Sequence, residues 1–207
     1  MFQFPSRFFV TATDTNVGKT VVSAMLTLGL DGTYWKPIQS GLEPMTDTDY
    51  VRAVTQLDRS HFIPEKFRLT QPLSPHLSAA IDGVAIHLSD FKLPETQHSH
   101  LIVEGAGGLL VPLNKTELII DLIKHLDLPV CLVARTQLGT INHTLLSIRQ
   151  LQRAGIPILG VIMNGDRNQA NREAIAHYGQ VPILGELEIL DPVNPGTLRT
   201  AFDQLFH

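Results

Sequence analysis

Short apolar runs alternate with stretches of helical periodicity along this chain. The apolar runs predict five strands, over residues 7–11, 33–36, 100–104, 130–134 and 158–163. These runs are nearly continuous in apolar residues, which is typical of strands that helices cover on both faces. The pattern therefore predicts an α/β fold built on a mostly parallel sheet.

The segments between the strands predict five helices, over residues 19–30, 49–57, 117–126, 140–154 and 169–178. In the fourth of these, Ile141, Leu145 and Ile148 recur at helical spacing, and Gly155 ends the pattern. Residues 37–94 are weaker in pattern and rich in proline and polar residues, so we expect loops there that shape a substrate site. We expect residues 1–207 to form a single domain.

The junction between the first strand and the first helix carries Gly18, Lys19 and Thr20. Loop amides and a helix N-terminus, which carries roughly half a positive charge, attract phosphate at such a junction. Lys19 then reaches the β- and γ-phosphates, and the Thr20 hydroxyl can bind Mg²⁺. The sequence therefore predicts a P-loop NTPase-type domain with helices on both faces of its sheet.

The predicted phosphate loop departs from the usual Gly-x-x-x-x-Gly-Lys-Thr spacing. That spacing needs glycine at position 13, where this chain has Thr13, and the nearest small residue is Ala12. Alanine tolerates positive φ poorly, so we expect Ala12 to be extended. This variation separates the loop from most kinase and GTPase loops.

Charged and polar residues follow several predicted strands, where parallel α/β sheets bind ligands. Lys36 ends the second strand before a proline, and Glu104 ends the third before a run of small residues. A carboxylate at a strand end can contact Mg²⁺ directly or through water. Asp47 and Asp49 precede a short helix, where either is a metal ligand or a helix cap. Asn164 follows the fifth strand, and its amide suits the edge of an adenine ring.

Composition excludes several classes of function. The formal net charge is −4 and no Lys/Arg cluster is present, which argues against nucleic-acid binding. No apolar stretch approaches the roughly 20 residues that span a membrane, and no signal peptide is visible, so we expect a cytoplasmic protein. The single cysteine, Cys131, lies within an apolar run and is expected to be a buried thiol without a catalytic role.

Six segments taken together resemble the dethiobiotin synthetase family. The matching segments are residues 13–20, 36–41, 74–76, 103–113, 138–143 and 182–186. They follow the family's order and extend over nearly the whole chain. The segment around Glu104 and the Leu-Gly-x-Ile-Asn-His stretch from Leu138 are specific, whereas Gly-Lys-Thr alone is not.

The resemblance implies a reaction in which 7,8-diaminopelargonate, CO₂ and ATP give dethiobiotin, ADP and phosphate, with Mg²⁺ as cofactor. It implies that an amine adds CO₂ to form a carbamate, whose oxygen attacks the γ-phosphoryl group to give a carbamic–phosphoric anhydride. The second amine then closes the ring. Such chemistry needs charge neutralisation and alignment, and it needs no activated serine or cysteine.

The resemblance and the loop together assign roles by residue. Lys36 and Lys19 are the expected catalytic residues, and Thr20, Asp49 and Glu104 are the expected Mg²⁺ ligands. The expected nucleotide-binding residues are Thr15, Asn16, Val17, Gly18, Lys19, Thr20, Val21, Asp49, Glu104, Gly105, Ala106, Gly107 and Asn164. For Asn16, where relatives carry an acidic residue, only the backbone contact is carried over.

The remaining expectations concern the substrate and the assembly. Ser40 and Thr15 are expected to contact the diamine. Thr140, Ile141 and Asn142 open a helix whose free amides suit a carboxylate. In the resembling family this contact comes from a second subunit, so the resemblance implies a homodimer with its active site at the interface.

Two other functions compete with this interpretation. One is an amide-forming ligase acting on cobalamin precursors, but those enzymes usually carry an additional glutaminase domain with a nucleophilic cysteine. The other is a regulatory ATPase of the partitioning type, which typically has a second lysine near the start of the phosphate loop. This chain has Thr11, Ala12 and Thr13 there, which favours the enzyme.

Overall fold

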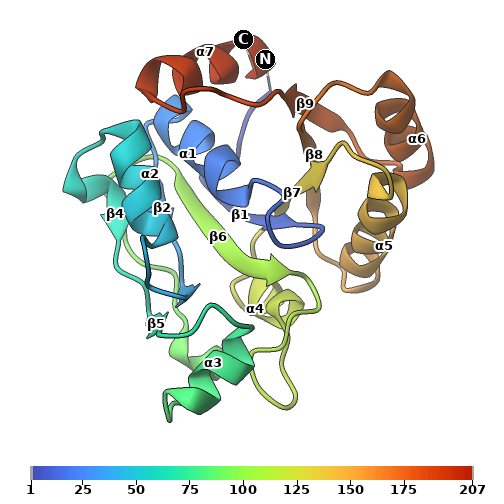
Figure 1. The fold of residues 1–207 in the computed structure, drawn as a ribbon. Coiled ribbons are helices and arrows are strands. Elements are labelled where there is room, and N and C mark those ends of the chain that lie inside the picture. The colour runs from blue at the N-terminus through green and yellow to red at the C-terminus, as the bar shows by residue number, and fades with distance from the viewer. Residues whose placement is uncertain (1, 207) are drawn as a thin grey trace.

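Seven parallel strands form the main sheet of the computed structural model, which describes residues 2–206 (Figure 1). In order across the sheet they are β4 (Phe62–Ile63), β2 (Thr33–Trp35), β6 (Leu101–Gly108), β1 (Arg7–Ala12), β7 (Val130–Arg135), β8 (Ile158–Asn164) and β9 (Ile183–Leu187). A separate parallel pair joins β3 (Ile38–Ser40) to β5 (Phe67–Leu69). The predicted parallel α/β fold is confirmed.

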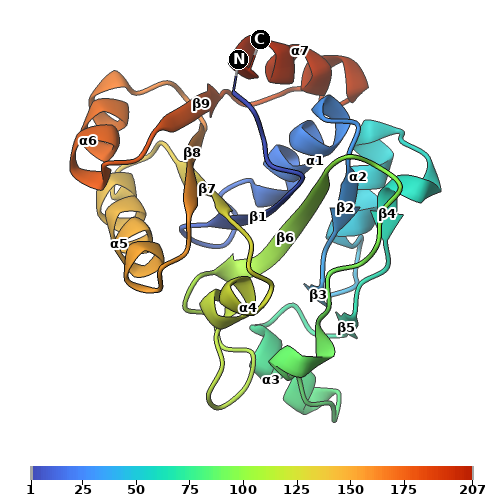
Figure 2. The ribbon, with the colours of Figure 1, turned by 180° about the vertical axis from the view of Figure 1, so that it is seen from behind.

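Helices cover both faces of the main sheet. On one face lie α1 (Lys19–Gly29), α2 (Asp47–Thr55) and α7 (Pro195–Phe206), and on the other lie α4 (Ile119–His125), α5 (Thr140–Arg153) and α6 (Gln169–Gly179) (Figures 1 and 2). Helix α3 (Pro75–Ile81) packs on the β3–β5 pair, and two short 3₁₀ turns, η1 (Arg59–His61) and η2 (Leu88–Asp90), complete the described elements.

The two helical layers explain why the strands are continuously apolar. Along β1, Phe8 and Val10 point into the core beneath α1 and α7, whereas Phe9 between them joins the core on the opposite face. All three side chains are fully buried. Successive strand residues point to opposite faces, so a strand covered on both sides needs apolar residues at every position.

The predicted elements match the observed ones closely, with informative differences. Strand β6 continues four residues beyond Glu104, so the small residues that follow it are strand and not turn. Helix α2 begins two residues earlier than predicted, at Asp47. The edge strands β4 and β9, the β3–β5 pair, and helices α3 and α7 were not predicted. Within residues 2–206, no helix is both long and apolar enough to cross a bilayer.

Candidate active site

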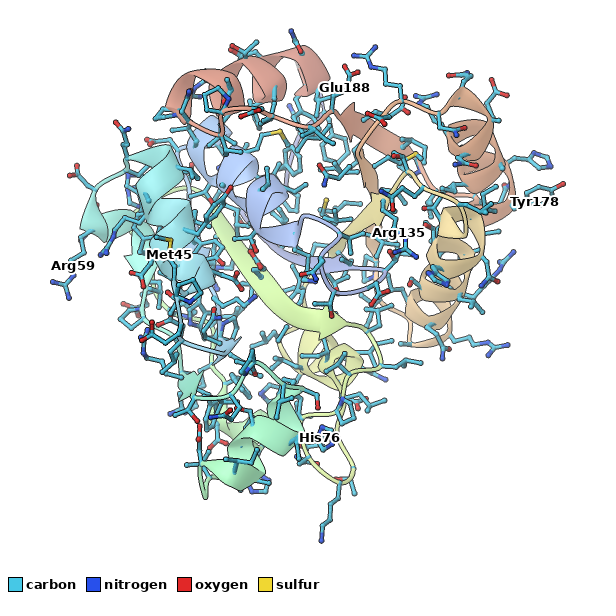
Figure 3. All side chains as sticks on the ribbon, viewed as in Figure 1. Met45, Arg59, His76, Arg135, Tyr178 and Glu188 are labelled. Carbon is cyan, nitrogen blue, oxygen red and sulfur yellow. The ribbon has the colours of Figure 1, made fainter. Side chains whose placement is uncertain are left out.

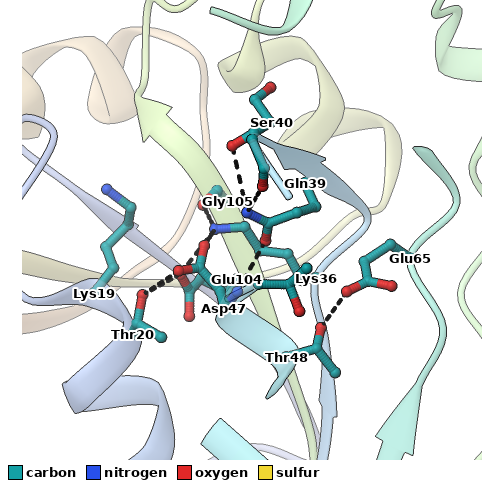
Figure 4. A network of polar contacts seen from close by, with 12 residues as sticks. Lys19, Thr20, Lys36, Gln39, Ser40, Asp47, Thr48, Glu65, Glu104 and Gly105 are labelled. Carbon is teal, nitrogen blue, oxygen red and sulfur yellow. Dashed lines mark hydrogen bonds and ion pairs between the residues drawn. The ribbon is translucent and has the colours of Figure 1, made fainter. Parts of the chain in front are cut away.

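A cavity of about 860 Å³ lies beyond the carboxyl ends of β1, β2 and β6, which are neighbours in the sheet. This adjacency brings together the phosphate loop after β1, Lys36 after β2 and Glu104 within β6. Lys19, Lys36 and Glu104 all line the same cavity, and Figure 4 shows the polar contacts among its residues. The three groups predicted to form the catalytic centre therefore share one site.

The phosphate loop uses two left-handed residues to turn from β1 into α1. Asn16 has φ 59° and Gly18 has φ 93°, whereas Ala12 is the last residue of β1 and is extended as expected. A Cβ atom on Gly18 would lie 2.1 Å from Nδ2 of Asn164. Glycine is therefore required at position 18 both for its backbone angles and for the close approach of β8.

Lys19 is held inside the loop with 7% of its surface exposed. Its Nζ donates a 3.1 Å hydrogen bond to the backbone oxygen of Asp14. Burial, and after it the nearby charge of Lys36, lowers the pKa of Lys19 to about 8. A cation that is costly to bury is stabilised by an incoming anion, which is the property a phosphate site needs.

Lys36 lies between two carboxylates on the opposite side of the cavity. Its Nζ is 2.9 Å from Oε1 of Glu104 and 2.5 Å from Oδ2 of Asp47, and it donates to the backbone oxygen of Gly105 at 3.1 Å (Figure 4). Burial opposes the charge of Lys36, but attraction to Glu104 and Asp47 outweighs it and raises the pKa of Lys36. Burial likewise opposes the charge of Asp47, yet Lys36 lowers the pKa of that carboxyl below its usual value.

Glu104 is fully buried and every oxygen of its carboxylate has a donor. Oε1 accepts from Thr20 at 3.0 Å and from Lys36 at 2.9 Å, and Oε2 accepts from the Tyr34 hydroxyl at 2.9 Å. The Thr20 hydroxyl also lies 3.2 Å from Oδ1 of Asp47. One threonine hydroxyl thus sits between two carboxylates, with the buried cation of Lys36 on their other side.

The structure places Asp47, and not Asp49, at the predicted metal site. Helix α2 is capped by Thr46, whose hydroxyl accepts from the Asp49 amide at 3.1 Å and donates to the Asp49 carboxylate at 2.8 Å. The Asp49 side chain turns outward to Arg52, 3.1 Å away. Asp49 therefore occupies the third helical position of a capping arrangement, and Asp47 in the first position faces Thr20. The sequence signal for this was the Thr-x-x-Asp spacing.

Sequence reasoning also missed two residues that hold the site in place. The Gln39 Oε1 accepts from the Asp47 amide at 3.1 Å, and its Nε2 donates to the Gly41 oxygen at 2.9 Å. Tyr34 is fully buried in β2, and its hydroxyl donates to the Glu104 carboxylate. Neither residue type suggests such a role from its place in the sequence.

Most of the other predicted nucleotide-binding residues line the cavity: Thr15, Asn16, Gly18, Thr20, Val21, Ala106 and Gly107. Val17 and Gly105 do not line it, but the backbone oxygen of Gly105 accepts from Lys36. The Asn164 amide donates to the backbone oxygen of Val17 at 3.0 Å. Asn164 thus braces the phosphate loop, and its predicted contact with the base stays a prediction.

The predicted substrate residues fall into two groups. Ser40 lines the cavity, and its buried Oγ has no hydrogen-bond partner among the described residues. Thr140, Ile141 and Asn142 form the first turn of α5 and do not line the cavity. The Thr140 hydroxyl donates to the backbone oxygen of Arg135.

The oxygen atoms around Thr20 suit a hard divalent cation. A hydroxyl and two carboxylates supply part of the oxygen shell that Mg²⁺ prefers, and substrate phosphates and water commonly supply the rest. Within residues 2–206, no group of three or more His, Cys, Asp or Glu side chains forms a metal site of its own.

The strand-loop-helix junction, the Gly-Lys-Thr at the start of α1 and the acidic strand end define a P-loop nucleotide-binding fold. Residues 6–197 match the family model described as an AAA domain. A ParA family ATPase from Chlorobium tepidum has the same fold, with TM-score 0.56, 14% identity and coverage of 98% of this chain and 99% of the other. The cell division ATPase MinD of Pyrococcus furiosus aligns with TM-score 0.55, 15% identity and coverage of 97% and 96%.

Sequence similarity identifies the family within this class. The chain is 49% identical to the ATP-dependent dethiobiotin synthetase BioD of Rhodopseudomonas palustris, over 97% of this chain and 96% of the relative. It is 48% identical to the enzyme of the same name from Brucella ovis, over 98% and 95%. The chain belongs to the family of ATP-dependent dethiobiotin synthetases, which are ligases. The predicted resemblance and enzyme class are confirmed.

Proposed function

We propose that this protein converts 7,8-diaminopelargonate, CO₂ and ATP into dethiobiotin, ADP and phosphate, as a step of biotin synthesis. The observation that carries the proposal is the buried Lys36, which shares one cavity with the phosphate loop and is held by Glu104 and Asp47. A second buried cation in the cavity of the phosphate loop suits an anion that meets a nucleotide phosphate. A carbamate is such an anion.

The proposed reaction has three steps. One amine of the substrate adds CO₂ and releases a proton, giving a carbamate. A carbamate oxygen then attacks the γ-phosphoryl group, forming the carbamic–phosphoric anhydride and releasing ADP. The second amine attacks the carbonyl carbon, closes the cyclic urea and expels phosphate.

This chemistry asks the protein for charge and alignment. The nucleophile is already an oxyanion, so no side chain needs to be activated for attack. Lys19 neutralises the β- and γ-phosphates, and Lys36 faces the carbamate and the transferring phosphoryl group. The side chains of Lys19 and Lys36 are buried, so water screens their interactions with developing negative charge only weakly. Loss of one such preorganised contact typically costs a factor of about 10²–10³ in turnover.

Mg²⁺ is the proposed cofactor, and it neutralises phosphate charge when bound. Thr20, Asp47 and Glu104 would hold it, in place of the predicted set that contained Asp49. The carboxylates of Asp47 and Glu104 lie close together, so their negative charges need a positive charge between them. Lys36 supplies the compensating charge until nucleotide and metal arrive.

The diamine is proposed to lie along the wall that contains Ser40 and Thr15. Ser40 lines the cavity and its buried hydroxyl has no hydrogen-bond partner among the described residues, which supports a contact with a substrate amine there. The first turn of α5, with Thr140, Ile141 and Asn142, is proposed to bind the substrate carboxylate in the cavity of a second copy. Two facts support this homodimer: these residues do not line their own cavity, and the adjacent Leu138 is completely exposed. We place the reaction in the cytoplasm, where ATP is supplied.

Mass analysis of the product tests the proposal directly. Purified protein is incubated with carbon-13 bicarbonate, ATP, Mg²⁺ and 7,8-diaminopelargonate, and with each component omitted in turn. We expect dethiobiotin that carries one labelled carbon, and ATP turnover that requires the diamine. Rapid ATP hydrolysis without the diamine, and no labelled product with it, would favour a switch ATPase instead.

A further inference from the structure

The two carboxylate oxygens of Glu104 have different partners. Oε1 accepts from Thr20 at 3.0 Å and from Lys36 at 2.9 Å, and both of these residues line the cavity. Oε2 accepts from the Tyr34 hydroxyl at 2.9 Å, and Tyr34 does not line the cavity. One oxygen is therefore turned toward the ligand site and the other is held on the protein side.

Strand register explains how Tyr34 reaches this position. Tyr34 in β2 pairs with Ile102 in the neighbouring strand β6, and Glu104 lies two residues further along. Ile102 and Glu104 point to the same face of the sheet because side chains alternate along a strand. Tyr34 and Ile102 share the core beneath α1, so the phenol extends along that face to the carboxylate.

The Tyr34 hydroxyl is a permanent donor at this position. The side chain is fully buried, with its ring 6.4 Å from that of Phe62. Burial, and after it the negative charge of Glu104, raises the pKa of Tyr34 well above its usual value. Among the described residues, Glu104 Oε2 accepts from no other side chain, so the Tyr34 hydroxyl alone occupies this oxygen.

We propose that Tyr34 sets the metal preference of this site by reserving Oε2, so that Glu104 offers a single oxygen to the metal. The inference rests on the proposed Mg²⁺ site. Mg²⁺ binds six ligands in strict octahedral geometry, to which one carboxylate contributes one oxygen. Ca²⁺ takes six to eight ligands and accepts both oxygens of a carboxylate. A carboxylate limited to one oxygen favours Mg²⁺ over Ca²⁺.

The test replaces Tyr34 by phenylalanine, which keeps the buried ring and removes only the hydroxyl. The ADP-bound protein is titrated separately with Mg²⁺ and Ca²⁺ by calorimetry, so the readout is metal affinity and not turnover. Tyr178→Phe is the matched control, because Tyr178 is 60% exposed and lies on α6 away from the cavity (Figure 3). Circular dichroism and thermal unfolding without metal check that both variants fold.

In Tyr34→Phe we expect Mg²⁺ affinity to fall about 10-fold, the usual effect of losing a residue that orients a metal ligand. Ca²⁺ affinity is expected to be retained or increased, because Oε2 becomes available. The Mg²⁺/Ca²⁺ affinity ratio should therefore fall at least about 10-fold, and should not change in Tyr178→Phe. An unchanged ratio in Tyr34→Phe, whether both affinities fall together or neither does, would overturn the inference.

The titration uses ADP and metal ions only, which separates this inference from the proposed reaction. If no dethiobiotin is formed but the ratio falls, the proposed reaction fails and the role of Tyr34 stands. If dethiobiotin is formed and the ratio is unchanged, the reaction stands and Tyr34 has no part in metal choice.

Discussion

Replacing Lys36 by methionine removes the cation that lies between two carboxylates and keeps a chain of similar length. In the free protein, breaking a buried ion pair by removing one partner typically costs about 3–5 kcal/mol. The Asp47 side chain is 33% exposed and can recover hydration, whereas Glu104 is 0% exposed and cannot. Glu104 keeps its hydrogen bonds from Thr20 and Tyr34, so we expect the lower end of that range, about 3 kcal/mol.

Thermal unfolding measures this cost. For a domain of about 200 residues, 1 kcal/mol corresponds to roughly 2–4 °C in Tm, so Lys36→Met should lower Tm by about 6–12 °C. Mg²⁺ should stabilise the variant more than the wild type, because it replaces the lost positive charge between the carboxylates. Turnover should fall about 10²–10³-fold, while ADP affinity changes little. Lys115→Met, at an exposed position away from the cavity, is the matched control.

Three results would refute this reasoning. A Tm within about 2 °C of the wild type would mean that Glu104 is not left unpaired. Equal stabilisation of both proteins by Mg²⁺ would mean that Lys36 and the metal do not share the carboxylates. If ADP affinity fell as much as turnover, Lys36 would contact the bound nucleotide and not the phosphoryl group that is transferred.

Three further predictions concern the metal, the phosphate loop and the dimer. Asp47→Asn should raise the Mg²⁺ concentration needed for half-maximal turnover about 10-fold. Asp49→Asn should leave that concentration unchanged and cost only about 1 kcal/mol of stability through the helix cap. The reverse pattern would make Asp49 the metal ligand. Because the pKa of Lys19 is about 8, the free protein loses this cation above pH 8, and ADP affinity should then fall by up to about tenfold per pH unit. Lys19→Arg, which stays charged, should remove that fall, and its persistence would assign the titration to another group. The dimer is tested by mixing two variants, Lys36→Ala and Asn142→Asp, each of which is expected to be inactive alone. The mixture should recover roughly one quarter of wild-type turnover. No recovery would mean that α5 does not contribute to the active site of the partner subunit.

The sequence predicted those parts of the site that follow directly from strand ends. Lys36 and Glu104 each close an apolar run, and Gly18, Lys19 and Thr20 mark the start of a helix. Once the sheet is parallel, all of them must meet at one edge. Strand direction and order are enough to predict that these residues share a cavity, and side-chain packing need not be known.

The parts that sequence reasoning missed depend on tertiary register or on helix starts. Tyr34 is an aromatic residue in a buried strand, and only its pairing opposite Ile102 brings its hydroxyl to Glu104. The sequence reasoning chose Asp49 for the position beside Thr20, where the structure has Asp47, because the cap at Thr46 was not recognised and the start of α2 was set two residues late. Helix α7 begins with a proline, which is usually taken as a helix breaker in a sequence but is favourable in the first turn of a helix.

The most direct test of the central claim follows oxygen from CO₂ into phosphate. In the proposed reaction a carbamate oxygen attacks the γ-phosphoryl group beside Lys36 and leaves with the phosphate when the ring closes. In a short incubation with oxygen-18 labelled CO₂, the inorganic phosphate released should carry one labelled oxygen for each dethiobiotin formed, as read by phosphorus NMR. Dethiobiotin that accumulates while the phosphate stays unlabelled would contradict the account.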